Sequence, residues 1–131
     1  MNLPRLTVYA GQGRCSVELT AIVAGEGFSL TLTGGEKPHV GGAAICYPNE
    51  DGSGQERCQE ICLPGHRDIE AARLVAEAVC RATGVATAVV CGIHIDDATA
   101  EEIETILSNC ADAAHQITSA LNILKKRDAN A

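Results

Sequence analysis

The chain has 131 residues, a formal net charge of -7 and an aromatic content of only 2%. This length fits one domain and is too short for two. The acidic balance argues against a nucleic-acid partner, because binding to phosphate backbones depends on clustered Lys and Arg, and single strands are usually held by aromatic stacking. We interpret the basic run Lys125, Lys126 and Arg127 as a complement to the dipole at the end of a helix.

The cysteines and the N-terminus indicate a cytoplasmic protein that is not embedded in a membrane. No apolar stretch approaches the roughly 20 residues of a membrane span, and residues 1–10 lack the apolar core of a signal peptide. We therefore interpret the seven cysteines as reduced thiols, most of them small buried residues. Cys58 and Cys62 lie in one predicted strand, more than about 10 Å apart, a poor spacing for a shared zinc ion.

The first half of the chain alternates polar and apolar residues, which is typical of half-buried strands. Residues 16–23 and 27–33 follow this pattern, and glycines between them predict a hairpin. Small residues at 40–47 predict a third strand, and residues 57–63 predict a fourth. Between these two lies a polar, turn-forming loop over 48–56.

The second half of the chain has helical spacing on both sides of one strand. Residues 68–83 predict a helix that Gly84 ends, and the continuous apolar run 85–91 predicts a strand buried on both faces. Thr99 with Glu102 forms a capping-box signature. The helix that follows should run for about 25 residues, because its apolar spacing continues through Leu124.

These elements predict a single α+β domain of order β-β-β-β-α-β-α. Its sheet is expected to be five-stranded and mostly antiparallel, with two helices on one face. Residues 16–124 form the predicted core, and residues 1–15 and 125–131 are predicted to be peripheral. If the fifth strand runs parallel to the fourth, as a crossover connection implies, then the second, fourth and fifth strands all end at one edge of the sheet.

That edge gathers most of the chemically active side chains. Each of its histidines has a glycine nearby, which permits close backbone approach, and two helix N-termini offer free N–H groups to an anion. The three imidazoles, together with an aspartate, suit a transition metal with an open position, whereas the basic side chains and helix N-termini suit a phosphate. The side chains concerned are Lys37, His39, His66, Arg67, Asp68, His94, Asp96 and Asp97.

Simpler roles remain open for some of these residues. Asp68, and either Asp96 or Asp97, are also candidates for helix N-caps. His115 lies on the polar side of the last helix and is expected at the surface. No GxSxG, HExxH or P-loop motif is present in the sequence, so no nucleophile or phosphate-binding signature accompanies either chemistry.

Three short motifs give the chain a family resemblance. GG at 34–35 with HVG at 39–41, PGHRD at 64–68 and GIHID at 92–96, in this order and spacing, resemble the prenylated-flavin chaperone family (LpdD-like). The resemblance covers roughly residues 16–122. The family often has a glutamate after His-Arg, where this chain has the shorter Asp68.

The resemblance implies a binding protein rather than a catalyst. Such a protein would receive reduced prenylated FMN from a flavin prenyltransferase, shield it, and deliver it to an apo form of a prenylated-FMN-dependent decarboxylase. The cofactor would be prenylated FMN or FMN. The residues expected to bind it are Gly34, Gly35, Lys37, His39, Gly41, Gly65, His66, Arg67, Asp68, Gly92, His94 and Asp96.

Two alternatives and one prediction about assembly accompany this interpretation. The chain is alternatively a small metal-dependent enzyme that uses His39, His66 and His94, or a structural accessory subunit. The long last helix is expected to overhang its sheet, which would expose its apolar stripe and favour a homodimer through residues 112–124. Residues 1–15 folding back over that overhang would serve equally well.

Overall fold

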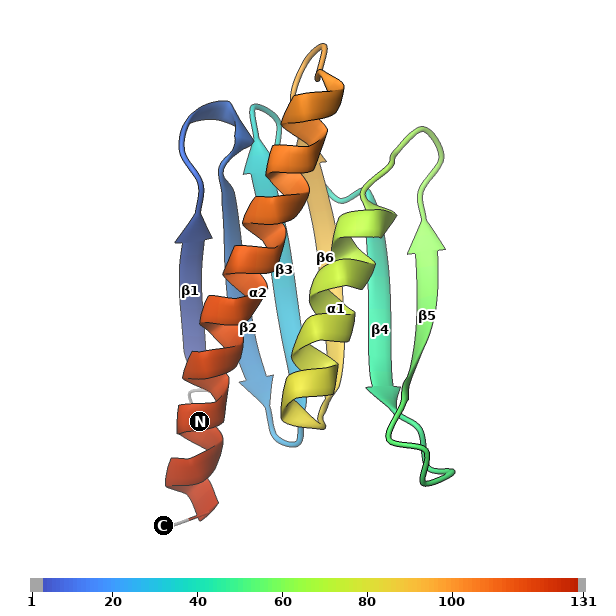
Figure 1. Ribbon diagram of the computed structural model, residues 1–131, viewed down its shortest axis with the longest axis vertical. Helices are drawn as coiled ribbons and strands as arrows, with labels where there is room; N and C mark the ends of the chain where they lie inside the picture. The colour runs from blue at the N-terminus through green and yellow to red at the C-terminus, as the bar shows by residue number, and fades with distance from the viewer. Residues whose placement is uncertain (1–3, 130–131) are drawn as a thin grey trace.

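The computed structural model describes residues 4–129, which form one sheet with two α-helices and a short 3-10 helix (Figure 1). The sheet has six strands, one more than predicted. The elements in chain order are β1 (Arg5–Ala10), the 3-10 helix η1 (Gly13–Cys15), β2 (Val17–Ala24), β3 (Gly27–Gly35), β4 (Gly42–Pro48), β5 (Glu56–Cys62), α1 (Ile69–Thr83), β6 (Ala86–His94) and α2 (Ala100–Ala129).

The strand order, β1-β2-β3-β6-β4-β5, differs from the predicted meander. The predicted hairpin of β2 and β3 is confirmed, but β6 lies between β3 and β4 rather than beside β5. It is parallel to β3 and antiparallel to β4, so the sheet is mixed. Because β5 is also antiparallel to β4, the strands β3, β5 and β6 all point to one edge, the upper edge in Figure 1. The predicted meeting of their loops therefore holds despite the different neighbours.

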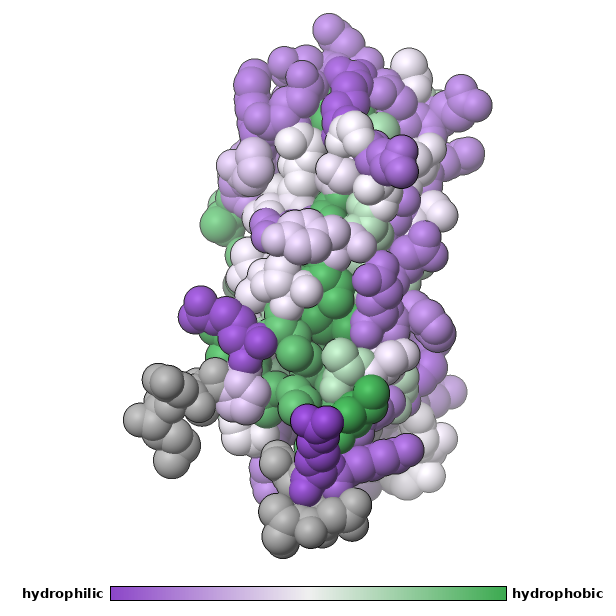
Figure 2. Space-filling view, turned by 90° about the vertical axis from the view of Figure 1, so that its left-hand side faces the viewer, coloured by the Kyte–Doolittle hydropathy of each residue, from purple (hydrophilic) through white to green (hydrophobic). Residues whose placement is uncertain are grey.

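Part of the N-terminal segment predicted to be peripheral belongs to the sheet. Residues 5–10 form β1, antiparallel to β2, with Ala10 buried in the core. The alternation of Leu6 and Val8 with polar neighbours is short, and its role depends on pairing with β2. Seen from the β1 side, apolar surface remains visible between α2 and this edge strand (Figure 2).

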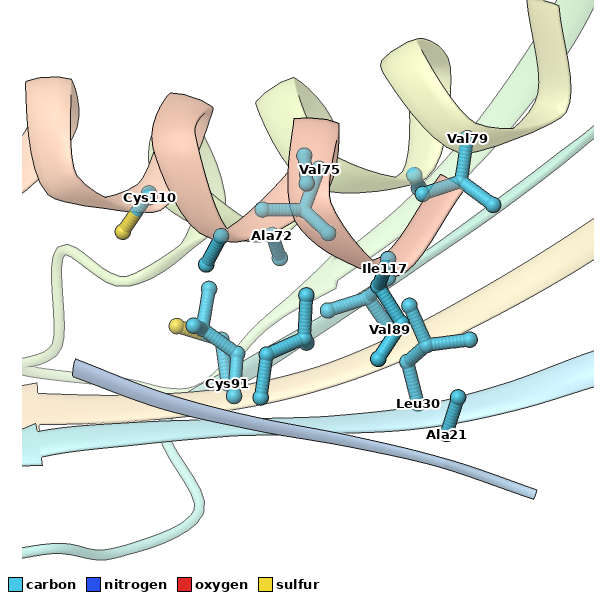
Figure 3. Packing of buried hydrophobic residues seen from close by; sticks show 14 of the residues in the cluster. Ala21, Leu30, Ala72, Val75, Val79, Val89, Cys91, Cys110 and Ile117 are labelled. Atoms are coloured by element: carbon cyan, nitrogen blue, oxygen red, sulfur yellow. The ribbon is translucent and has the colours of Figure 1, made fainter. Parts of the chain in front are cut away.

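Both helices cover one face of the sheet, as predicted (Figure 1). Helix α1 packs on β4 and β6, and α2 packs on β1, β2 and α1. Aliphatic side chains from the two helices meet those of the central strands in a closely packed layer (Figure 3). Gly84 ends α1 as predicted, with a left-handed φ of 70° and its N–H bonded to the Cys80 carbonyl oxygen at 2.8 Å.

The opposite face of the sheet carries no described element, which corrects the prediction for β6. Its apolar run was expected to be buried on both faces, but Ala88 and Val90 are only half-buried, whereas Val89 and Cys91 are fully buried. The outward positions of β6 are small and apolar without being covered by the rest of the chain. The continuous run therefore reflects an uncovered apolar face.

The last helix begins as predicted but does not need a second chain to cover its apolar stripe. Thr99 and Glu102 exchange the two bonds of a capping box, at 3.1 Å each. Ile117 and Leu121 are 0% and 1% exposed because β1, β2 and α1 lie against α2. These two residues therefore give no reason for a dimer through residues 112–124, although Ile123 remains 55% exposed, and cover by the N-terminal segment accounts for the buried part of the stripe.

The cysteines are not all free thiols, which corrects the sequence interpretation. Cys46 and Cys58 lie directly opposite each other on β4 and β5 and form a disulfide, while five cysteines remain free. This pairing depends on strand register, which cysteine spacing along the chain does not reveal. The cysteine count therefore gives no ground for a reducing compartment. In the described part of the chain, neither helix combines the length and apolar character needed to cross a bilayer.

Candidate functional site

Three loops bring three histidines together at the upper edge of the sheet. His39 follows β3, His66 follows β5, and His94 is the last residue of β6. The ring centroids of His39 and His66 are 4.6 Å apart, and those of His39 and His94 are 6.5 Å apart. The residues between β6 and α2 and the first turn of α1 complete this edge.

Asp68 is the buried centre of the group. It occupies the N-cap position of α1, but its side chain makes no cap bond to that helix. Instead, Oδ1 accepts a hydrogen bond from the Ile93 N–H at 2.8 Å, and Oδ2 lies 2.9 Å from His39 Nε2 and 4.0 Å from His66 Nδ1. With its side chain 6% exposed, the carboxylate is held by β6 in an orientation that faces both imidazoles.

The hydrogen-bond partners of His39 indicate which of its ring nitrogens carries a hydrogen. Nδ1 lies 2.9 Å from the Lys37 carbonyl oxygen, which only accepts, so Nδ1 carries a hydrogen. A bare Nε2 lone pair would then face the Asp68 carboxylate at 2.9 Å, an unfavourable contact. The contact therefore requires either a proton between Nε2 and the carboxyl group or a metal ion. The bond to Lys37 and the Asp68 carboxylate accordingly raise the pKa of His39, against the opposing effect of burial.

Two glycines allow His39 and Asp68 to approach this closely. A Cβ on Gly41 would lie 1.9 Å from Asp68 Oδ2 and 2.8 Å from His39 Nε2. A Cβ on Gly92 would lie 1.5 Å from the His39 carbonyl oxygen. The glycines thus permit close approach, as expected, but the groups that approach them are His39 and Asp68 of the chain itself.

A cavity of about 490 Å³ opens beside these histidines. One side is polar, with the three imidazoles, Arg67 and the carboxylates of Asp68 and Glu70. The other side is aliphatic, and much of it comes from the first turns of α2, which the sequence pattern assigned to the core. The aliphatic lining residues are Ala71, Ile93, Ile95, Ala98, Ile103, Ile106 and Leu107.

His94 belongs to a second, more exposed polar cluster at the rim. Its Nε2 lies 3.0 Å from Asp96 Oδ1, which also accepts from Lys37 Nζ at 3.3 Å. Arg14 of η1 extends this cluster by binding Glu102 at 2.7 Å and the Asp96 carbonyl oxygen at 3.1 Å. Because Arg14 lies in the segment predicted to be peripheral, no sequence signal marked it.

Only some of the remaining predicted site residues line the cavity. Gly65, His66 and Arg67 line the cavity with Asp68, as expected. Gly34 and Gly35 line a separate hollow next to Gly11 and Gly13, and are not part of the cavity wall. His115 is exposed on α2, as predicted.

Within the described residues, one group of side chains could hold a metal ion. Its members differ from the three histidines predicted. His39, His66 and Asp68 each offer a ligand atom, and these atoms all lie within 4.8 Å of one another. Asp68 thus takes the place of His94, whose ring is bonded to Asp96. The difference arises from the buried position of Asp68, which spacing along the chain does not reveal.

Comparison with known proteins identifies the family of this chain. Residues 11–122 match the family described as the prenylated flavin chaperone LpdD-like domain. The chain belongs to this family. The match includes all three histidine-bearing loops and η1. Among curated proteins, none matches the chain.

The fold is shared with a chaperone of another kind. A chain from the crystal structure of a chaperone complex for yeast 20S proteasome assembly superimposes with a TM-score of 0.57. The alignment covers 96% of this chain and 98% of that chain, at 12% sequence identity. At this identity the likeness concerns the fold alone.

Proposed function

We propose that this member of the prenylated flavin chaperone family binds reduced prenylated FMN in the cavity beside His39, His66 and His94. The observation that supports the proposal is the division of the cavity into a polar, imidazole-lined side that includes Arg67 and an aliphatic side. A prenylated flavin nucleotide has the same two characters, an anionic phosphate and an apolar modified ring. Arg67 and the N-terminus of α1 suit the phosphate, because both present N–H donors.

The aliphatic wall explains how a protein with 2% aromatic residues holds a flavin. Ile103, Ile106 and Leu107 project from one face of α2 into the cavity, and Ile93 and Ile95 face them from β6 and the loop after it. Contact with these side chains replaces aromatic stacking by burial of apolar surface. Ile103 is 45% exposed, so a bound ring would cover it further.

We further propose that the protein receives the reduced cofactor from a flavin prenyltransferase and releases it to an apo-decarboxylase. A cavity that opens at the end of the sheet, between loops, suits transfer better than permanent retention, because the ligand leaves without unfolding of the core. The alternative, a metal-dependent enzyme, has support only from the His39, His66 and Asp68 group.

The test is an anaerobic titration with reduced prenylated FMN and with reduced FMN. Ile103→Glu should weaken binding of the prenylated cofactor at least tenfold, because it places a charge in the aliphatic wall. Ile123→Glu is the matched control, since Ile123 is an exposed isoleucine (55%) on the same helix outside the cavity. Binding no tighter than millimolar, or equal losses in both variants, would contradict the proposal.

Transfer needs a separate measurement. Protein loaded with reduced prenylated FMN should activate an apo-decarboxylase faster than free cofactor does at the same concentration. If the loaded protein slows activation instead, the protein stores the cofactor and does not deliver it.

We also propose that the carrier is a homodimer, but through the open face of the sheet rather than through α2. One row of outward side chains crosses all six strands without a charge, which is unusual in a chain with 21% charged residues. Six strands present roughly 500 Å² in projection, which approaches the roughly 800 Å² per partner of a standard interface. The row consists of Thr7, Thr20, Thr31, Val90, Ala43 and Ile61.

A further inference from the structure

We propose that His39, His66 and Asp68 bind a divalent transition-metal ion, with the open coordination positions of the ion facing the cavity. The first support is the arrangement around His39 Nε2. Its ring is oriented by the bond from Nδ1–H to the Lys37 carbonyl oxygen, the arrangement that metal-bound histidines commonly show. Nε2 thereby faces Asp68 Oδ2 at 2.9 Å, a contact that needs either a proton or a metal ion between the two atoms.

The second support is that the carboxylate is fixed and oriented before any ion binds. Asp68 Oδ1 accepts from the Ile93 N–H, so Oδ2 is left to face the two imidazoles. The absent side chain of Gly41 keeps the space at Oδ2 clear. A residue that served only as a helix cap would direct its carboxylate to α1, and Asp68 does not.

The distances fit ions of the first transition row. With metal–ligand bonds of about 2.0–2.2 Å, neighbouring ligand atoms lie about 2.8–3.1 Å apart around an octahedral ion and about 3.3–3.6 Å apart around a tetrahedral one. The Oδ2 atom of Asp68 lies 2.9 Å from His39 Nε2 and 4.0 Å from His66 Nδ1. The His39–Asp68 distance already suits two ligands of one ion, whereas His66, which is exposed on its loop, must move closer to complete the site.

The ligand types select the metal class. Two imidazoles and one carboxylate suit Fe²⁺, Mn²⁺, Co²⁺ or Zn²⁺, whereas Mg²⁺ and Ca²⁺ prefer all-oxygen sites. A divalent ion with one carboxylate leaves a net charge of +1 at the cavity wall. If the proposed function holds, a phosphate oxygen of the flavin nucleotide occupies an open position of this ion; the metal site itself does not depend on that function.

The experiment titrates Co²⁺ into protein purified without a histidine tag and with its metals removed. The expected result is one Co²⁺ per chain, with visible d–d bands and no thiolate charge-transfer band. His66→Ala should weaken binding at least tenfold, and it should fold because His66 is exposed. Asp68→Asn, which preserves shape, should weaken binding similarly.

Two control variants exclude adventitious binding. His115→Ala removes an exposed imidazole on α2, and Cys62→Ser removes a thiol whose Sγ lies 3.2 Å from the His66 carbonyl oxygen. Both should bind Co²⁺ like the wild type. Absence of Co²⁺ binding, or equal binding by His66→Ala, would overturn the inference and leave a proton on His39 Nε2 as the explanation of the contact.

The same samples separate this inference from the proposed function. Tight binding of reduced prenylated FMN by metal-free protein, without any Co²⁺ site, refutes the metal and preserves the carrier. Stoichiometric Co²⁺ binding without any flavin binding refutes the carrier and preserves the metal site.

Discussion

At the residue scale, the pairing of His39 with Asp68 depends on close backbone packing at Gly92 and Gly41. Gly92 lies on β6 directly beneath the backbone of His39, and the Gly41 N–H bonds to the Cys91 carbonyl oxygen at 2.8 Å. The segment that carries His39 therefore rests on β6 with no space for a side chain between them. This contact, together with the Ile93 bond to Asp68, fixes the histidine–carboxylate pair.

Gly92→Ala should lower the free energy of unfolding by about 1–3 kcal/mol, because its Cβ would displace the His39 backbone. Urea unfolding measures the change. Gly27→Ala is the control, since a Cβ there meets nothing nearer than 3.6 Å. Equal stabilities of the two variants would show that the His39 segment moves aside at no cost.

At the element scale, the start of α2 is held by a network that reaches across the fold. Glu102 accepts the Thr99 N–H within the capping box and also binds Arg14 through both of its oxygens. The bond to Arg14, with that to Thr99, lowers the pKa of Glu102 to about 2. The helix that supplies the aliphatic wall is thus anchored to η1, at the opposite end of the sequence.

This lowered pKa predicts how stability depends on pH. A depressed folded-state pKa contributes stability that is present above the unfolded value, about 4.3, and is lost as pH falls toward about 2. Glu102→Gln should therefore destabilise the protein most above about pH 5, and the difference from wild type should shrink as the pH falls. Urea titrations at low salt measure it. Glu101→Gln removes a charge from the same turn, and its difference in stability from wild type should not shrink in the same way as the pH falls.

At the scale of the whole molecule, two layers leave one face of the sheet without cover. The helices bury one face, and the other presents short, mostly uncharged side chains, including Ile45 at 49% and Ile61 at 68% exposure. The exposed isoleucines lie on β4 and β5, on the same face as the threonines of β1, β2 and β3, and exposed apolar side chains gathered in this way mark interaction sites. A second copy, with its sheet about 10 Å away, is the simplest cover.

Light scattering tests this assembly. Wild type should be a dimer at micromolar concentration, and Ile45→Lys should be a folded monomer, because its side chain is already exposed in one chain. Ile123→Lys, equally exposed but on α2, should remain dimeric. A monomeric wild type would contradict the prediction.

Local patterns along the sequence determined most of the elements and the edge that holds the site. Alternation marked β2 and β3, helical spacing marked both helices, and Thr99 with Glu102 marked the start of α2. These signals depend on residues a few positions apart, so they survive any change in how the elements are arranged. Strand direction alone then placed the three histidine loops at one edge, which does not depend on which strands are neighbours.

The tertiary structure decided everything that depends on pairing and burial between distant segments. It placed β6 between β3 and β4, made β1 a strand of the sheet, and paired Cys46 with Cys58. It also buried Asp68 against β6, which gives this carboxylate, rather than His94, the place beside His39 and His66. Strand order, register and burial arise from contacts between residues far apart in sequence, and no local pattern encodes them.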